Sequence, residues 1–251
     1  MQIGLIGAGN MARAMARGWG RPLLCSDPVA ELAHTLAQEV GGEALESNLE
    51  VAQRADIVVL CHKPAQLREV ADELAHDARA VASILAGVSL TDLRAAYPDR
   101  PTYRFIPSLP VEVREGAVVQ AAGATNDATL DVSVSELFSE LGTLVVLDDS
   151  LVDVAMGLMS CAPAYVALVA EAQIEAGVRR GIPAAEGAEL VVQTLAGTAE
   201  LLRRRGYDTV AVRREVTSPG GVTARGIAAL ERAGLRTAFS DALDAVLGGG
   251  R

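Results

Sequence analysis

Lysine, histidine and aromatic side chains are scarce in this sequence. Lys63 is the only lysine among 251 residues, the three histidines all lie in the first third, and aromatic residues make up 3% of the chain. From Asp149 onward there is neither lysine nor histidine. Because a dehydrogenase of hydroxy acids normally needs one of these bases beside the substrate hydroxyl, the second half of the chain is poorly suited to that chemistry.

Cysteine is also scarce, and its spacing excludes two common kinds of site. Cys25, Cys61 and Cys161 are odd in number, far apart and not arranged as CxxC, so neither a disulfide framework nor a zinc site is predicted. The histidines are not grouped with cysteines or carboxylates at metal-ligand spacing. We therefore expect no bound metal.

Basic charge and long apolar runs are missing as well. The 32 acidic residues outnumber the 22 basic ones, which gives a net charge of -10 and no basic surface for a nucleic acid backbone. The longest apolar runs, such as residues 156–170, stop short of the ~18 to 20 residues that span a bilayer. No basic leader precedes an apolar stretch at Met1. We expect a cytoplasmic protein with no nucleic acid or membrane partner.

The first half of the chain alternates short apolar runs with helical patterns. With 50% hydrophobic and 22% charged residues, the chain has enough apolar material for two folded domains of modest size. Strand followed by helix, repeated, predicts a parallel sheet with crossover helices. The predicted strands are residues 2–6, 22–25, 56–60, 80–85, 102–106 and 143–147, and the predicted helices are residues 11–18, 28–40, 64–78 and 130–141.

The second half has a different pattern, with helical segments and no convincing strand from Asp149 onward. Breaks between helices are predicted at Pro163, 181–183, 205–206 and 218–221. Ser150, with Asp153 three residues later, has the pattern of a capping box that opens the first helix. We predict an α/β fold in two domains: a Rossmann-type doubly wound sheet at 1–148 and an all-α domain at 149–251.

A glycine-rich turn links the first predicted strand to the first helix. In the segment GAGNMA at 7–12, the first glycine permits a tight turn and the second lets a pyrophosphate approach the backbone. Ala12 allows close packing of helix on strand, and Asp27, twenty residues beyond Gly7, is placed to bind a ribose hydroxyl. This context favours dinucleotide binding over a turn that only connects two elements. The predicted cofactor-binding residues of this region are Gly7, Ala8, Gly9, Asn10, Met11 and Asp27.

A second glycine-rich segment precedes a helix in the second domain. Residues 216–223, VTSPGGVT, place two glycines and several hydroxyls where the helix begins, and the free amides of a helix start suit a carboxylate. A reduced nicotinamide supplies hydride, and an imine can arrive already protonated, so a hydroxyl is enough to orient it. The alternative is plain helix capping by Ser218 or Thr223.

Six segments, in order and over almost the whole chain, resemble the pyrroline-5-carboxylate reductase family. They are residues 4–15, 61–64, 104–116, 162–182, 193–197 and 218–231. The SPGG-x-T pattern at 218–223 is specific to that family. Its combination with the glycine-rich segment at 7–12 is highly specific. The resemblance implies an oxidoreductase that acts on a C=N bond, reducing 1-pyrroline-5-carboxylate to L-proline with NADPH or NADH in the last step of proline biosynthesis.

The resemblance also implies residue roles and an assembly. It maps the substrate site onto Ser218, Gly220, Gly221 and Thr223, the nicotinamide side onto Lys63 and Pro64, and catalysis onto Thr223, Ser218 and Lys63. From position alone, Lys63 is as readily a solvated charge at a strand end. In the family the helical domain dimerises and completes the site, so a homodimer or a higher oligomer of dimers is expected. The run Val154–Ala170 fits such an interface, because it is apolar around too much of its circumference for a surface helix.

Three departures from the family pattern leave other functions open. Residues 106–110 read IPSLP where the family usually has MPNTP, residues 160–165 read SCAPAY where it has GSGPAY, and His62 replaces an apolar residue. One alternative is a paralogue that reduces a related cyclic imino acid, and another is a regulatory protein that binds a dinucleotide without turnover. On cofactor choice, Asp27 would repel a 2′-phosphate and favours NADH, whereas the family commonly accepts NADPH.

Overall fold

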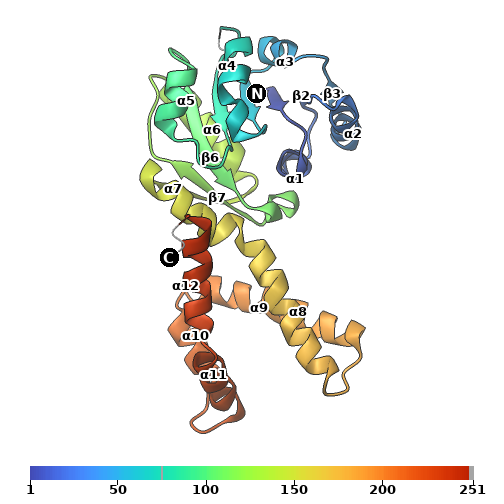
Figure 1. Ribbon diagram of the computed structural model, residues 1–251, viewed down its shortest axis with the longest axis vertical. Coiled ribbons are helices and arrows are strands. Elements are labelled where there is room, and N and C mark those ends of the chain that lie inside the picture. Colours follow the sequence, from blue (N-terminus) through green and yellow to red (C-terminus); the bar gives the residue numbers. More distant parts are fainter. Residues whose placement is uncertain (75, 249–251) are drawn as a thin grey trace. The chain divides into compact units, whose positions relative to one another are not determined.

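The chain forms two compact units in this computed structural model, which describes residues 1–74 and 76–248. The first unit is Met1–Pro163 and the second begins at Ala164. Figure 1 follows both along the chain, from the blue N-terminus to the red last helix. By contacts, the first unit extends beyond the predicted domain boundary at residue 148, because Val152 and Ala155 belong to its core.

The elements alternate between strands and helices as far as β8 and are helical thereafter. The strands are β1 Ile3–Ile6, β2 Leu24–Ser26, β3 Glu43–Ala44, β4 Ile57–Leu60, β5 Val81–Ser83, β6 Thr102–Pro107, β7 Gly116–Ala121 and β8 Gly142–Leu147. The α-helices are α1 Asn10–Trp19, α2 Ala30–Val40, α3 Asn48–Arg54, α4 Leu67–Leu74, α5 Leu90–Ala96, α6 Ala128–Ser139, α7 Asp149–Ala155, α8 Ala162–Val178, α9 Ala184–Arg204, α10 Thr209–Glu215, α11 Val222–Arg232 and α12 Leu235–Val246. Short turns of 3-10 helix, η1 Pro64–Gln66 and η2 Leu109–Val113, and a π-helical segment, η3 Met156–Ser160, complete the set.

The first unit is built on one sheet with the strand order β3-β2-β1-β4-β5-β6-β7-β8. The chain moves outward from β1 to β3, returns to β4 and then continues in the other direction. All neighbours pair in parallel except β6 and β7. This confirms the predicted doubly wound sheet. Its strand order reverses between β1 and β4, and in such sheets ligands bind beside this point, at the carboxyl ends of the strands.

Two apolar cores cover the two faces of this sheet. β1 and β4 are buried along their whole length, as expected for parallel strands with helices on both sides. One core is filled from α1, α2 and α6, where the Phe138 ring stacks on Phe105 and meets Trp19 edge-on. The other core is filled from α3, α4, α5 and α7. The central strands of the sheet are therefore packed on both faces.

The predicted strands and helices of the first unit are all present, but the sequence reading missed β3, β7, α3 and α5. β3 is two residues long, which is too short for a visible pattern. β7 follows η2 and a turn in which Arg114 has a φ of 60°, so the chain comes back antiparallel to β6 over a short connection. A regular alternation of strand and helix does not anticipate such a return.

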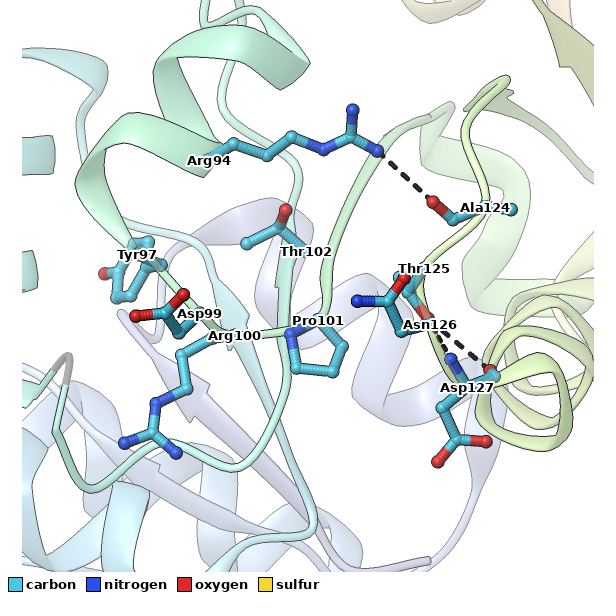
Figure 2. Close-up of a pocket in the computed structure, with 10 residues that line it drawn as sticks. All are labelled: Arg94, Tyr97, Asp99, Arg100, Pro101, Thr102, Ala124, Thr125, Asn126 and Asp127. Carbon is cyan, nitrogen blue, oxygen red and sulfur yellow. Dashed lines mark hydrogen bonds between the residues drawn. The ribbon is translucent and has the colours of Figure 1, made fainter.

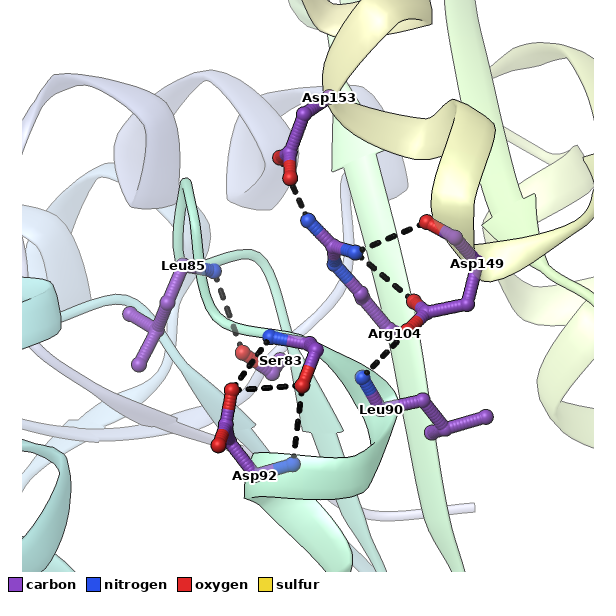
Figure 3. A network of polar contacts seen from close by, with 8 residues as sticks. Ser83, Leu85, Leu90, Asp92, Arg104, Asp149 and Asp153 are labelled. Atoms are coloured by element: carbon purple, nitrogen blue, oxygen red, sulfur yellow. Dashed lines mark hydrogen bonds and ion pairs between the residues drawn. The ribbon is translucent and has the colours of Figure 1, made fainter.

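Arg104 in β6 holds α7 against the sheet, as Figure 3 shows. Its side chain is 1% exposed, Nη1 donates to Asp149 Oδ1 at 2.8 Å, and Nη2 donates to Asp153 Oδ1 at 2.6 Å. The predicted capping box of Ser150 and Asp153 is wrong: the N-cap is Asp148, without a side-chain cap bond, and Asp153 binds the arginine. A guanidinium away from water needs such partners because an unpaired buried charge is costly.

The described part of the second unit consists of helices α8 to α12 with no strand, as predicted. The break predicted at Pro163 lies just before it: η3 ends at Ser160, Cys161 forms a bend and α8 begins at Ala162, so Pro163 lies in the first turn of α8, where proline is tolerated. Most large apolar side chains of this unit are exposed, including Leu168 at 63%, Leu190 at 61% and Val222 at 75%. A unit with so little core of its own requires a further surface to pack against.

The helical run Asp149–Val178 is longer and more apolar than the sequence reading indicated. It joins α7, η3 and α8, and by length and composition alone it is sufficient to cross a membrane, with 17% of its apolar window buried. The expectation that no apolar segment reaches such a length is therefore wrong. The reason is that three helical pieces, read separately in the sequence, continue into one another.

Candidate functional site

The turn between β1 and α1 depends on its glycines in two different ways. Gly7 has a φ of +101°, and a Cβ there would lie 2.9 Å from both the carbonyl carbon and the carbonyl oxygen of Cys61. A Cβ on Gly9 would meet nothing within 4 Å, so this glycine leaves open space at the start of α1. Ala12 is 1% exposed and lets α1 pack closely on the sheet, as predicted.

Two amides of the turn are used by the protein itself. The Gly7 N–H donates to the Ser26 carbonyl and the Ala8 N–H donates to Asp27 Oδ2, both at 2.8 Å. Asp27 Oδ1 accepts from the Val29 N–H, also at 2.8 Å. Gly7 and Ala8 therefore shape the turn and have no amide to offer to a ligand. Asp27 has a structural role that the sequence did not reveal, and its remaining lone pairs are those that a ribose hydroxyl would use.

The start of α1 keeps its amides free. Among the described residues, the N–H groups of Gly9, Asn10 and Met11 have no acceptor, because a helix leaves its first N–H groups unpaired. The helix dipole places partial positive charge at the same point. An anion such as a pyrophosphate therefore suits this helix start, beside the space that Gly9 leaves open.

A cavity of about 620 Å³ opens at this edge of the sheet. The wall of the cavity includes Gly7 and Gly9 from the turn, Asp27 after β2, and Lys63 and Pro64 after β4. The structure thus brings together five of the predicted cofactor residues from three separate segments. Lys63 is exposed and also lines the cavity, so its cationic side chain is available to an anionic ligand there.

Carboxylates gather at one end of this region. A hollow of about 370 Å³ beside Asp27 is lined also by Glu46 and Glu73, and its described lining residues include no lysine or arginine. Asn48 lies among them, donating from Nδ2 to Glu73 Oε2 at 2.6 Å and accepting from Ser26 Oγ at 2.8 Å. This end is therefore negatively charged.

A smaller chamber of about 230 Å³ adjoins the cavity and shares Cys61, His62 and Pro64 with it. Its other lining residues are mostly apolar and come from α1, from the ends of β5 and β6, and from η3: Met11, Ile84, Leu85, Ala86, Ile106, Pro107, Met156 and Ser160. An apolar chamber with few polar groups suits a flat ring that carries one polar substituent.

His62 is one of the few polar residues that line this chamber. Its Nδ1 lies 2.9 Å from the Lys63 carbonyl oxygen, while Nε2 is buried and has no partner among the described residues. Burial lowers the pKa of the His62 imidazole, against smaller raising effects of the Lys63 carbonyl and of Glu69. Burial also raises the pKa of the Cys61 thiol. Both groups are therefore uncharged at neutral pH.

Two of the family departures, at Ser108 and Ser160, have different places in the fold. Ser108 is buried and pairs with Ala117 through both its N–H and its Oγ, so it closes the β6–β7 ladder and does not line the chamber. Ser160 does line it, and its Oγ donates to the Pro107 carbonyl at 3.0 Å. Ser160 ends a π-helical segment, a feature that is frequent at functional sites.

In the second unit, residues 218–223 form a turn that leads into α11. Gly220 has a φ of +67°, and Gly221 is the N-cap, so the alternative of capping by Ser218 or Thr223 is wrong. The Gly221 N–H donates to the Ser218 carbonyl at 3.0 Å and is not free for a carboxylate. Among the described residues, the N–H groups of Gly220, Val222 and Thr223 and the two hydroxyls have no partner.

A further hollow, of about 590 Å³, lies at the opposite edge of the sheet, before β6 and after β7 (Figure 2). Arg94 and Arg100 line it together with Asp99 and Asp127, so its charges largely cancel. Arg94 donates to the carbonyl of Ala124 at 3.5 Å. None of the predicted site residues lies there, and the candidate site is the one beside the glycine turn.

Two family models match the chain. Residues 149–249 match a model described as pyrroline-5-carboxylate reductase dimerisation. Residues 2–87 match one described as NADP oxidoreductase, coenzyme F420-dependent. The second match spans the glycine turn, Asp27 and the segment after β4, which together form the cavity wall.

Relatives of similar length extend the likeness over the whole chain. A pyrroline-5-carboxylate reductase of Synechocystis sp. is 34% identical over 254 residues, covering 98% of this chain and 95% of the relative. The solved 1-pyrroline-5-carboxylate reductase of Streptococcus pyogenes is 29% identical, with a TM-score of 0.90 over 99% of this chain and 97% of its own. The pyrroline carboxylate reductase of Plasmodium falciparum, solved with NADP bound, is 25% identical, with a TM-score of 0.88 over 98% and 95% of the two chains. The chain therefore belongs to the pyrroline-5-carboxylate reductase family.

Proposed function

We propose that this protein reduces 1-pyrroline-5-carboxylate to L-proline with a reduced nicotinamide dinucleotide. The observation that carries the proposal is the turn at 218–223, where two hydroxyls and three amides are free at the start of α11. A turn that only capped a helix would use one of these hydroxyls for the cap. Family membership supplies the substrate class that such a turn would hold.

The first unit has the features that a dinucleotide requires. The free amides of Gly9, Asn10 and Met11 would hold the pyrophosphate, and Asp27 would hold the adenine ribose. Lys63 and Pro64, with the apolar chamber beside them, would hold the nicotinamide side. When bound, NADH or NADPH supplies the hydride. The protein contributes position and an apolar surrounding.

The second unit has the groups for an imino acid. The free N–H groups of Gly220, Val222 and Thr223 would donate to the substrate carboxylate. The Thr223 hydroxyl would accept from the protonated imine nitrogen, and Ser218 would contribute a second hydroxyl. Gly221 would act through the shape of the turn, since a Cβ there would lie 2.3 Å from Ser218 Oγ. Orientation is the main task, because the iminium carries its own positive charge.

We further propose a homodimer in the cytoplasm. The dimerisation model covers the whole apolar run Asp149–Val178 and the exposed side chains Leu168 and Leu190. A second copy of this domain is therefore the proposed cover for that surface, in preference to lipid. A helix packed in this way would be buried in the assembly although it is exposed in the single chain.

A panel of cyclic imino acids tests the reaction and its alternatives. Oxidation of NADH and NADPH would be followed by absorbance with 1-pyrroline-5-carboxylate and with its six-membered-ring counterpart. The proposal predicts faster turnover of the five-membered ring. Faster turnover of the larger ring would identify a paralogue with another substrate. No oxidation with either compound, while cofactor binds, would identify a regulatory protein.

A further inference from the structure

His62 has one atom for which neither the fold nor the proposed reaction provides a use. Nε2 is buried, has no partner among the described residues, and belongs to a side chain that lines both the apolar chamber and the cavity. Buried polar atoms in folded proteins are nearly always hydrogen-bonded. An orphan atom beside a cavity therefore points to a ligand that completes it.

The hydrogen bond at the other ring nitrogen fixes what Nε2 can do. The Lys63 carbonyl, 2.9 Å from Nδ1, is only an acceptor, so the hydrogen of the neutral imidazole sits on Nδ1. Nε2 is then a bare acceptor. Burial lowers the pKa of His62 and keeps this neutral form at physiological pH. The missing partner must be a hydrogen-bond donor.

The chamber limits what that donor can be. A cavity of roughly 150 Å³ is enough to hold a benzene ring, so the chamber of about 230 Å³ has room for a nicotinamide ring. A reduced nicotinamide ring carries one N–H donor group, its carboxamide. His62 also lines the cavity that Gly9 and Asp27 line, where the dinucleotide is proposed to bind.

We propose that His62 is a specificity-determining residue for the cofactor, whose Nε2 accepts a hydrogen bond from the nicotinamide carboxamide. The inference rests on the proposed function only in requiring that the chain binds a nicotinamide dinucleotide. An apolar residue at this position would provide the same packing but no acceptor. The hydrogen bond would orient the ring within a chamber that otherwise offers mainly apolar contacts.

Binding of a cofactor analogue provides the test, with calorimetry as the readout. In reduced 3-acetylpyridine adenine dinucleotide a methyl ketone replaces the carboxamide, which keeps the carbonyl and removes the N–H donor. The parent protein should bind NADH about five- to tenfold more tightly than this analogue, the effect of one hydrogen bond. His62→Leu should bind both with the same affinity. His62→Gln, which restores an acceptor, should recover most of the preference.

ADP-ribose, which lacks the nicotinamide, is the control for an intact site and should bind equally to the parent and both variants. The proposal is overturned if the parent does not distinguish NADH from the analogue, or if His62→Leu keeps the parent's preference. It is also overturned if His62→Leu lowers affinity for both dinucleotides equally. Failure of the parent to bind any dinucleotide would instead overturn the proposed function, and this inference with it.

Discussion

The Ala8 N–H donates a 2.8 Å hydrogen bond to Asp27 Oδ2 and thereby joins the glycine turn after β1 to the end of β2. Asp27 is therefore both part of the fold of the turn and a lining residue of the cavity. Replacing Asp27 would alter both the conformation of the turn and the wall of the cavity. Cofactor choice is better probed at Glu46, which lines the same acidic hollow without holding the turn.

We expect a preference for NADH over NADPH of about tenfold or more in kcat/KM. The 2′-phosphate of NADPH would meet Asp27, Glu46 and Glu73 in a hollow without lysine or arginine among its described lining residues. Glu46→Arg should narrow or reverse the preference, while Glu136→Arg, the same charge change on α6, should leave it unaltered. Steady-state kinetics with both cofactors would decide. A tenfold preference for NADPH in the parent would show that the acidic hollow does not receive the ribose.

Gly9→Val should abolish cofactor binding without unfolding the protein. A Cβ at Gly9 meets no protein atom within 4 Å, so its side chain would fill the space predicted for the pyrophosphate. Gly7→Ala is the contrasting variant, because its Cβ would clash with Cys61 and its φ is positive. We expect it to lower the free energy of unfolding by about 1–3 kcal/mol. Calorimetric titration and thermal melting would separate the two effects, and tight binding by Gly9→Val would place the pyrophosphate elsewhere.

The protein should be a dimer at micromolar concentration. Light scattering should give at least twice the 26.1 kDa mass of the chain, because the second unit exposes Leu168 and Leu190 and buries little of its own apolar surface. Leu168→Glu should weaken association. Val132→Glu, at a similarly exposed apolar residue on α6, should not. A parent protein that elutes and scatters as a monomer would contradict the proposed interface.

Thr223→Ala should lower kcat/KM for 1-pyrroline-5-carboxylate by roughly ten- to 150-fold, while Thr223→Ser should keep most activity. The loss corresponds to one hydrogen bond to a charged group, about 1.5 to 3 kcal/mol. Since Gly221 is the N-cap of α11, the alanine variant should melt at the parent's temperature. Equal activity of the parent and both variants would show that the hydroxyl does not touch the substrate.

Much of the fold was predictable because its signals are local. The apolar strands, the glycine turn and the change to an all-helical pattern after residue 148 are each visible within a short window of sequence. Gly7 and Gly9 were placed correctly at a turn between strand and helix, with a tight turn predicted at the first and an open approach at the second. The sequence did not reveal that Cys61 leaves no room for a side chain at Gly7, because Cys61 is distant in sequence and adjacent in space.

What the sequence reading missed depends on long-range pairing. Arg104 binds both Asp149, which is 45 positions away in sequence, and Asp153. Because this pairing is not visible in a short window of sequence, Asp153 was wrongly predicted to be part of a helix cap. The orphan Nε2 of His62 is a consequence of burial at the end of β4, and burial of one ring nitrogen has no sequence signature. The resemblance to a known family was informative for the 218–223 turn, where local rules favoured a simple cap.

Identification of the product is the most direct test of the proposed reaction. The parent protein would be incubated with 1-pyrroline-5-carboxylate and NADH, and the product would be resolved by chiral chromatography with mass detection. We predict one L-proline formed for each NADH oxidised. Protein that is folded, dimeric and able to bind NADH, yet forms no proline under these conditions, would contradict the assignment.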